Sequence, residues 1–147
     1  MIEALMPERI TNSDTETEQA GRDLAAILER ESDELICVSL YGDLGAGKTA
    51  FVRGMASLLS EGSRVSSPTY AIVNEYRKGK RPFYHYDMYR IEGEDDLVSI
   101  GFFDLTQGIM AIEWSENIED CLPEKRIEVR IEKIGEQSRR ITFSRIG

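Results

Sequence analysis

The segment "GDLGAGKT", residues 42–49, constrains the fold more than any other part of the chain. It matches GxxxxGK(S/T), the pattern of a phosphate-binding loop. The preceding run "ELICVSLYG" is apolar and ends in glycine, as is typical of a buried parallel strand. Apolar residues at helical spacing then predict a helix from Lys48 to about Leu59. This strand–loop–helix order predicts a site for a polyphosphate at the start of the helix.

Each position of the loop has a chemical task. Glycines allow consecutive backbone N–H groups to converge on phosphate oxygens, and the helix N-terminus adds a partial positive charge. The side chain of Lys48 would reach the terminal phosphates, and the hydroxyl of Thr49 would ligate Mg²⁺. We therefore expect the nucleotide to contact Leu44, Gly45, Ala46, Gly47, Lys48 and Thr49.

The remaining patterns predict an α/β fold in one domain over residues 1–147. A first helix is expected over 15–30, with Thr15 as its cap and Glu18 completing a capping box. Residues 69–90 alternate around Gly79 and predict a hairpin, as do residues 125–146 around Gly135. "GEDDLVSIGF" predicts a short helix and "GIMAIEW" a second buried strand. Together these elements predict a mixed sheet with a parallel core and antiparallel hairpins.

Two carboxylates could complete a catalytic site. Glu113 closes the apolar run "IMAIE" and is the leading candidate to hold Mg²⁺ or position a water, although a surface Glu at a strand end is the alternative. Asp87 is the second candidate, and it could instead be a capping Asp or form a salt bridge with Arg90. Alternation places His85 on the same face as Asp87, where a hydrogen-bonded structural histidine is favoured over a catalytic base.

Two further residues have both a structural and a functional interpretation. Trp114 is the only tryptophan; it is either part of the core or close to the nucleotide, because it follows Glu113. Thr69 lies in "SSPTY", which is either an ordinary loop or a switch segment that senses the terminal phosphate or its Mg²⁺.

Charge and hydropathy exclude some classes of protein. The formal net charge of −9 argues against a protein that binds nucleic acid by itself, since phosphate contacts need a basic face. No apolar run approaches the ~20 residues of a membrane span, so no membrane association is expected. The start "MIEALMPERI" lacks the basic-then-apolar order of a signal peptide, and we expect a cytoplasmic location.

The missing motifs favour an adenine nucleotide. A GTPase would carry NKxD and DxxG, and neither pattern occurs in the chain. A small-molecule kinase remains an alternative, as does a nucleotide-gated binding protein without meaningful hydrolysis. The favoured hypothesis at this point is a compact ATPase, or an ATP-dependent switch that acts on another protein.

Five segments in order resemble the TsaE (YjeE) family, and the similarity runs from about Thr11 to the end of the chain. These segments are "GDLGAGKTAF", "SSPTYAIVNEY", "YHYDMYRI", "IGFFD" and "AIEWSE". The family comprises bacterial P-loop ATPases required for threonylcarbamoyladenosine modification of tRNA. Two departures from its pattern are modest: Ala50 replaces a second Thr after the loop, and Ser115 replaces the commoner Pro after Trp114.

The resemblance implies a three-layer P-loop fold, binding of ATP and Mg²⁺, and weak hydrolysis in the absence of partners. It implies action through the TsaB–TsaD complex, which would make most of the contacts to tRNA. In the absence of partners we expect a monomer. The basic cluster "YRKGKRPF", residues 76–83, is either a solvated turn or a contact to tRNA or an acidic partner. The family motifs assign roles to Lys48, Thr49, Thr69, Asp87, Glu113 and Trp114. Of these, Thr49 and Glu113 would hold the metal, and Lys48, Asp87 and Glu113 would serve catalysis.

Overall fold

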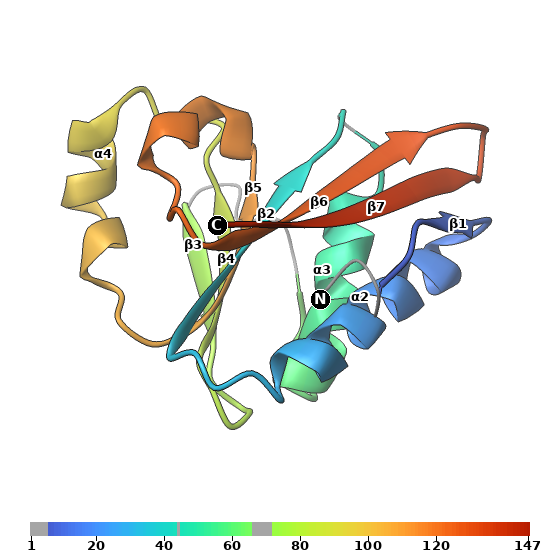
Figure 1. The fold of residues 1–147 in the computed structure, drawn as a ribbon, viewed down its shortest axis with the longest axis horizontal. Helices are drawn as coiled ribbons and strands as arrows, with labels where there is room; N and C mark the ends of the chain where they lie inside the picture. The colour runs from blue at the N-terminus through green and yellow to red at the C-terminus, as the bar shows by residue number, and fades with distance from the viewer. Residues whose placement is uncertain (1–5, 44, 66–71) are drawn as a thin grey trace.

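A seven-stranded sheet runs through the computed structural model, which describes residues 6–43, 45–65 and 72–147. The strand order is β1-β7-β6-β2-β5-β4-β3. Each strand is drawn as an arrow in Figure 1. The strands are β1 (Arg9–Thr11), β2 (Leu35–Tyr41), β3 (Val73–Tyr76), β4 (Phe83–Asp87), β5 (Gly108–Glu113), β6 (Arg126–Lys133) and β7 (Arg139–Ile146).

The centre of the sheet is parallel and its flanks are antiparallel. Strand β2 pairs in parallel with both β5 and β6, and β4 pairs in parallel with β5. The predicted hairpins add β3 to β4 and β7 to β6, both antiparallel. Strand β1, which the sequence patterns did not indicate, pairs with β7. The prediction of a mixed sheet with a parallel core and antiparallel hairpins is confirmed.

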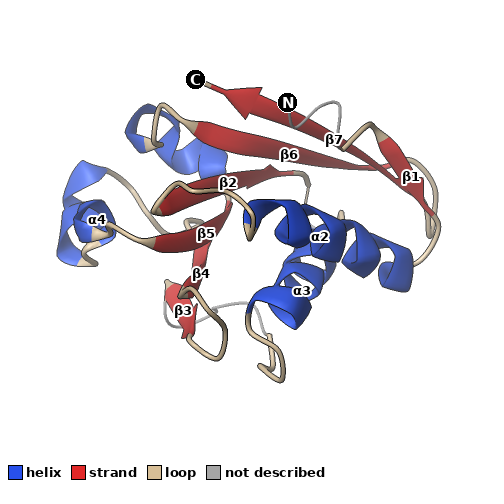
Figure 2. Cartoon of the chain, turned by 60° about the horizontal axis from the view of Figure 1, so that its bottom comes forward, coloured by secondary structure: helices blue, strands red, loops and turns tan. Residues whose placement is uncertain are grey.

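Helical segments cover both faces of this sheet, giving three layers (Figures 1 and 2). Helices α2 (Asp14–Leu28) and α3 (Lys48–Leu59) lie together on one face. On the other face lie α4 (Glu94–Ser99) and two 3-10 segments, η1 (Phe102–Asp104) and η2 (Ser115–Cys121). No helix in the described ranges combines the length and the apolar character needed to cross a membrane.

Alternation along the central strands separates two hydrophobic cores. From β2, Ile36, Val38 and Leu40 pack in the core that includes α2 and α3. Cys37 points the other way, into the core with α4 and η2. Burial raises the pKa of the Cys37 thiol to about 12, so it behaves as a small protonated apolar group.

The N-cap of the first helix lies two residues earlier than predicted, and the helix ends at Leu28 rather than at residue 30. Ser13 is extended, with φ −162°, and its side chain accepts a hydrogen bond from the Glu16 N–H, so Ser13 is the N-cap in place of Thr15. In a capping box, the acidic side chain of the first turn accepts a hydrogen bond from the N–H of the cap residue. Here the Glu16 carboxylate accepts instead from the N–H of Asn12, one residue before the cap, at 3.0 Å. Glu18 instead pairs with Arg53 of α3 at 2.8 Å.

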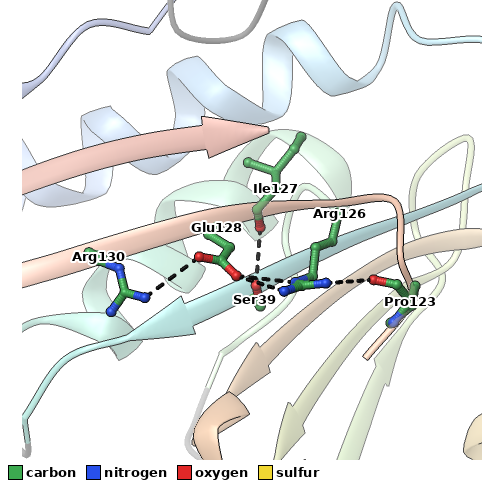
Figure 3. Close-up of polar contacts among 6 residues, drawn as sticks. All are labelled: Ser39, Pro123, Arg126, Ile127, Glu128 and Arg130. Carbon is green, nitrogen blue, oxygen red and sulfur yellow. Dashed lines mark hydrogen bonds and ion pairs between the residues drawn. The ribbon is translucent and has the colours of Figure 1, made fainter. Parts of the chain in front are cut away.

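A row of polar side chains runs along the face of β6 that points away from α2 and α3 (Figure 3). Arg126 donates to Glu128 and to the Pro123 carbonyl, and Glu128 also lies 3.6 Å from Arg130. The guanidinium of Arg130 covers the Tyr41 ring at 4.4 Å. Residues two apart on a strand share a face, so the Arg126, Glu128 and Arg130 side chains contact one another along β6, and Arg130 reaches the end of β2 through Tyr41.

Helices α2 and α3 approach each other closely through two glycines. A Cβ on Gly21 would lie 2.1 Å from the carbonyl oxygen of Phe51, and a Cβ on Gly54 would lie 1.8 Å from that of Glu18. Both obstacles are backbone atoms, so a side chain could be accommodated only if the helices moved apart. The contact therefore fixes α2 against the helix that begins at the phosphate-binding loop.

We predict that Gly54→Ala lowers the free energy of unfolding by about 2 kcal/mol or more, because of overpacking at the helix contact. Helix propensity alone predicts the opposite sign, a gain of about 1 kcal/mol. Urea denaturation measures the difference. The control is Gly93→Ala, where an added Cβ meets nothing within 4 Å and a cost of about 1 kcal/mol or less is expected. A stabilised Gly54→Ala variant would contradict the close contact.

Candidate nucleotide-binding site

The loop between β2 and α3 adopts backbone conformations that require glycine at both ends. Gly42 has φ 156°, and a Cβ there would lie 2.6 Å from the Ile131 carbonyl oxygen of β6. Gly47 has φ 105° and is the N-cap of α3. The two glycines that define the predicted motif are thus explained by backbone geometry.

The N-terminus of α3 is open to an anion. Its first-turn N–H groups have no intrahelical acceptor, Gly47 has no side chain to cap them, and the first turn contains no acidic residue. The helix begins at Lys48 and ends at Leu59, as predicted. The positive end of α3 is therefore not capped by a carboxylate from its own first turn.

Lys48 is a buried cation held by neutral groups. Lys48 is only 5% exposed, and its Nζ donates a hydrogen bond to the Gly42 carbonyl at 2.7 Å. Nζ also lies 4.5 Å from the centre of the Trp114 ring. Among the described residues, no carboxylate lies within 4.0 Å of this ammonium group. A buried ammonium without an ionic partner favours binding of an external anion.

A cleft of about 390 Å³ brings most of the predicted site residues together. Its lining comprises Asp14, Gly45, Gly47, Lys48, Thr49, Ala50, Arg53, Asp87, Glu113, Trp114 and Arg139. Ala46 is buried outside this lining, and its N–H donates to the Asp43 carbonyl at 3.0 Å. The predicted contacts of Leu44 and Thr69 lie outside the described residues.

Glu113 is held by His85. The Glu113 residue is 5% exposed at the end of β5, and its Oε2 lies 2.5 Å from His85 Nε2 on β4. When Glu113 is a carboxylate it can only accept, so Nε2 is then the donor. The other ring nitrogen, Nδ1, has no hydrogen-bond partner among the described residues. The interpretation of Glu113 as a surface residue is wrong, and His85 has a hydrogen bond that orients an acidic group of the cleft.

Asp87 lies next to Glu113 at the same edge of the sheet. The two residues are register partners at the ends of β4 and β5. The Asp87 carboxylate accepts a hydrogen bond from the Tyr89 N–H at 3.0 Å, and it has no ion pair with Arg90 among the contacts of the described residues. Asp87 is also one of the residues that line the cleft.

Trp114 has an unusual backbone conformation. It is the only non-glycine residue with positive φ among the described residues, at φ 59° and ψ 40°. Such a conformation is disfavoured for a bulky residue and occurs often at functional sites. The half-buried ring contacts the Lys48 ammonium and lies 5.0 Å from the ring of Tyr89. Trp114 thus packs against the core with α4 and η2 and also lines the cleft, and its proximity to a nucleotide stays a prediction.

Two charged residues of the cleft, Arg53 and Arg139, were not predicted from the sequence, and a third, Asp14, was indicated only loosely. Asp14 opens α2, Arg53 follows Lys48 by five positions on α3, and Arg139 begins β7. Arg53 could have been inferred from its place in the helix after the loop. Asp14 belongs to the segment "TNSDT", which the family resemblance indicates, by a loose match, as a place to hold the adenine. Arg139 has no local signal, because only the folded sheet brings it to residues 45–49.

A larger cleft of about 530 Å³ lies on the other side of Trp114, against β6. It is lined by Tyr41, Gly42, Asp43, Trp114, Glu116, Arg130, Ile131, Glu132 and Lys133. It lacks Lys48, Thr49, Asp87 and Glu113. The chemistry needed for phosphates and a divalent cation is in the smaller cleft, so we assign the candidate site there.

The basic cluster of residues 76–83 forms the turn between β3 and β4, and much of it is exposed. Arg77 pairs with Glu75 at 3.1 Å, and Lys78 Nζ donates to the Gly62 carbonyl at 3.2 Å. The Lys78 contact lies just past the end of α3 that is opposite the phosphate-binding loop, and none of the cluster lines the cleft, so this cluster is not part of the candidate site.

Known proteins resemble this chain along most of its length. Residues 11–141 match the family described as "Threonylcarbamoyl adenosine biosynthesis protein TsaE". The tRNA threonylcarbamoyladenosine biosynthesis protein TsaE of Bacillus subtilis is 40% identical over 124 residues, 84% of this chain and 77% of that protein. The TsaE protein of Haemophilus influenzae is 41% identical, over 76% of this chain and 73% of that protein. The TsaE protein of Aquifex aeolicus is 36% identical, over 96% of this chain and 98% of that protein.

A solved structure has the same fold. The crystal structure of Bacillus subtilis YdiB superposes with a TM-score of 0.76 at 34% sequence identity, over 95% of this chain and 85% of that one. The fold, the family match and these identities agree with the resemblance found in the sequence segments. The chain belongs to the TsaE family.

Proposed function

We propose that this protein binds and hydrolyses ATP in the presence of Mg²⁺, as a subunit of the system that makes threonylcarbamoyladenosine in tRNA. The observation that carries the proposal is the Lys48 ammonium, which is buried without a carboxylate partner among the described residues and faces the open N-terminus of α3. The assignment to this pathway rests on the family, because its members in several bacteria are named for this biosynthesis.

The phosphates of ATP match the charge of this site. Lys48 can exchange its bond to the Gly42 carbonyl for a stronger, charge-assisted bond to a phosphate oxygen. The free N–H groups at the start of α3 supply further donors. ATP is favoured over GTP because the chain contains neither NKxD nor DxxG.

The oxygen groups of the cleft suit Mg²⁺. The Thr49 hydroxyl and the Glu113 carboxylate line the same cleft, and both are hard oxygen ligands of the kind this ion prefers. The described residues contain no cluster of three His, Cys, Asp or Glu ligands, which fits an ion bound by one or two protein groups together with phosphates. When bound, the ion would neutralise charge on the phosphates.

Glu113 and Asp87 would act on the attacking water. One oxygen of Glu113 is occupied by His85, so the other can accept a hydrogen bond from water in the cleft. His85 fixes the direction of that carboxylate, which makes it a positioning residue. Asp87, held by the Tyr89 N–H, offers a second acceptor beside it. Positioning and charge stabilisation are the main contributions a protein makes to phosphoryl transfer.

Partner proteins would control the hydrolysis. The family resemblance points to the TsaB–TsaD complex, and a net charge of −9 suits a subunit that contacts tRNA mainly through other proteins. We expect weak hydrolysis by the protein alone and faster hydrolysis in the complex. This dependence distinguishes the proposal from a metabolite kinase, which would transfer phosphate to a small molecule, and from a nucleotide-gated binding protein.

We predict that Glu113→Gln lowers the rate of ATP hydrolysis by about 100-fold while the Kd for MgATP changes only a few-fold, because the Gln amide keeps an oxygen for the metal but accepts more weakly from the attacking water. Phosphate release and isothermal titration calorimetry measure the two quantities. Glu116→Gln, an exposed carboxylate two residues beyond Trp114, is the control and should hydrolyse ATP like the wild type. Full turnover in Glu113→Gln would exclude the assigned role.

We predict that adding TsaB and TsaD together raises the rate of ATP hydrolysis by at least tenfold, because we expect the protein alone to hydrolyse ATP slowly and its partners to complete the catalytic site. The assay compares phosphate release by the protein alone, by TsaB–TsaD alone and by the mixture. Running the mixture with the Glu113→Gln variant assigns any added activity to this subunit. A rate that equals the sum of the separate rates would count against the proposed partnership.

A further inference from the structure

Arg139, the first residue of β7, contacts the backbone of the phosphate-binding loop. Its Nε donates to the Ala46 carbonyl at 2.8 Å, and one terminal nitrogen donates to the Gly45 carbonyl at 3.3 Å. The other terminal nitrogen donates to the Ser138 carbonyl at 3.1 Å, within its own hairpin. The planar guanidinium therefore bridges two segments that lie more than 90 residues apart in the sequence.

The charge of Arg139 is not neutralised by a carboxylate of the described residues, although the chain carries 27 acidic residues. By contrast, Arg53 on the same cleft pairs with Glu18 at 2.8 Å. The acceptors of Arg139 are neutral carbonyl groups, and the residue lines the cleft that holds Lys48. A second unpaired cation thus lies at the candidate phosphate site.

Residues at the start of α2 also lie next to the phosphate-binding loop and the β6–β7 turn. Ser138 Oγ donates to the Asn12 side-chain oxygen at 2.8 Å, which joins the β6–β7 turn to the residues before α2. A Cβ on Gly47 would lie 3.6 Å from Thr17 Cγ2 and 3.7 Å from Arg139 Nε. Thr17 and Arg139 therefore flank the last glycine of the loop.

The contact to Ala46 has a direct effect on the loop. In a trans peptide the C=O of one residue and the N–H of the next point in opposite directions. Holding the Ala46 carbonyl toward Arg139 therefore directs the Gly47 N–H to the opposite side. The backbone N–H groups are the donors that phosphates need, so fixing the peptide plane preorganises the loop.

We propose that Arg139 is a positioning residue for nucleotide binding, which holds the loop carbonyls of Gly45 and Ala46 and adds an unpaired positive charge to the phosphate site. This inference rests on the proposed function, because it names a further residue of the same nucleotide site. The rigid planar fork of a guanidinium holds both carbonyls in a fixed geometry, whereas the flexible ammonium of a lysine replaces the charge with weaker positioning.

The test compares three variants by calorimetric titration with MgADP. Arg139→Ala should weaken binding by about tenfold to 100-fold. Arg139→Lys should remain weakened by at least about fivefold, since it keeps the charge but loses the fork. Arg140→Ala is the matched control: the neighbouring residue lies 3.9 Å from Glu8 and from Glu132, outside the cleft lining, and should bind MgADP like the wild type.

Hydrogen–deuterium exchange of the ligand-free proteins gives a second readout that does not depend on nucleotide. Amides of residues 43–49 should exchange faster in both Arg139 variants than in Arg140→Ala, while thermal unfolding shows that each variant is folded. Wild-type affinity in Arg139→Ala, full rescue by Arg139→Lys, or unchanged exchange in the loop would overturn the inference. If the wild type itself does not bind MgADP, the proposed function fails, and the exchange measurement still decides whether Arg139 positions the loop.

Discussion

The buried ammonium of Lys48 is the interaction on which the site depends. It is held by one carbonyl, that of Gly42, and by the face of Trp114, and both are neutral. Such contacts satisfy only part of the hydration that the ammonium loses on burial. The polyphosphate of a nucleotide would supply the missing negative charge, with donors already arranged at the start of α3.

The sheet topology explains how the acidic groups reach this cation. Strands β2, β5 and β4 are parallel neighbours, so their carboxyl ends lie at one edge of the sheet. The loop leaves from β2, Glu113 ends β5 and Asp87 ends β4. Ligand sites of open α/β sheets occur at this edge for the same reason. On the other side of β2, β6 pairs in parallel and carries the polar row that Figure 3 shows, and its continuation into β7 brings Arg139 to the loop.

Local patterns predicted those features that depend on near neighbours in the chain. The bounds of α3, the parallel core, both hairpins and the clustering of Lys48, Thr49 and Glu113 follow from motif spacing and hydrophobic periodicity. The cap of α2 was misplaced because Ser13 and Thr15 are both good capping residues, and only the backbone geometry decides between them. The His85–Glu113 bond depends on the register of β4 against β5, and the Arg139 contact on a hairpin 90 residues away. Neither register nor long-range packing leaves a local signal in one sequence.

In the proposed function, the buried Lys48 ammonium binds the phosphates of ATP. Calorimetric titration of MgATP into the wild type, Lys48→Ala and Lys78→Ala tests it most directly, since Lys78 is an exposed lysine at the far end of α3. We predict 1:1 binding by the wild type and by Lys78→Ala, and binding weaker by about 30-fold or more in Lys48→Ala. Equal affinity in all three proteins, or no binding by the wild type, would contradict the account.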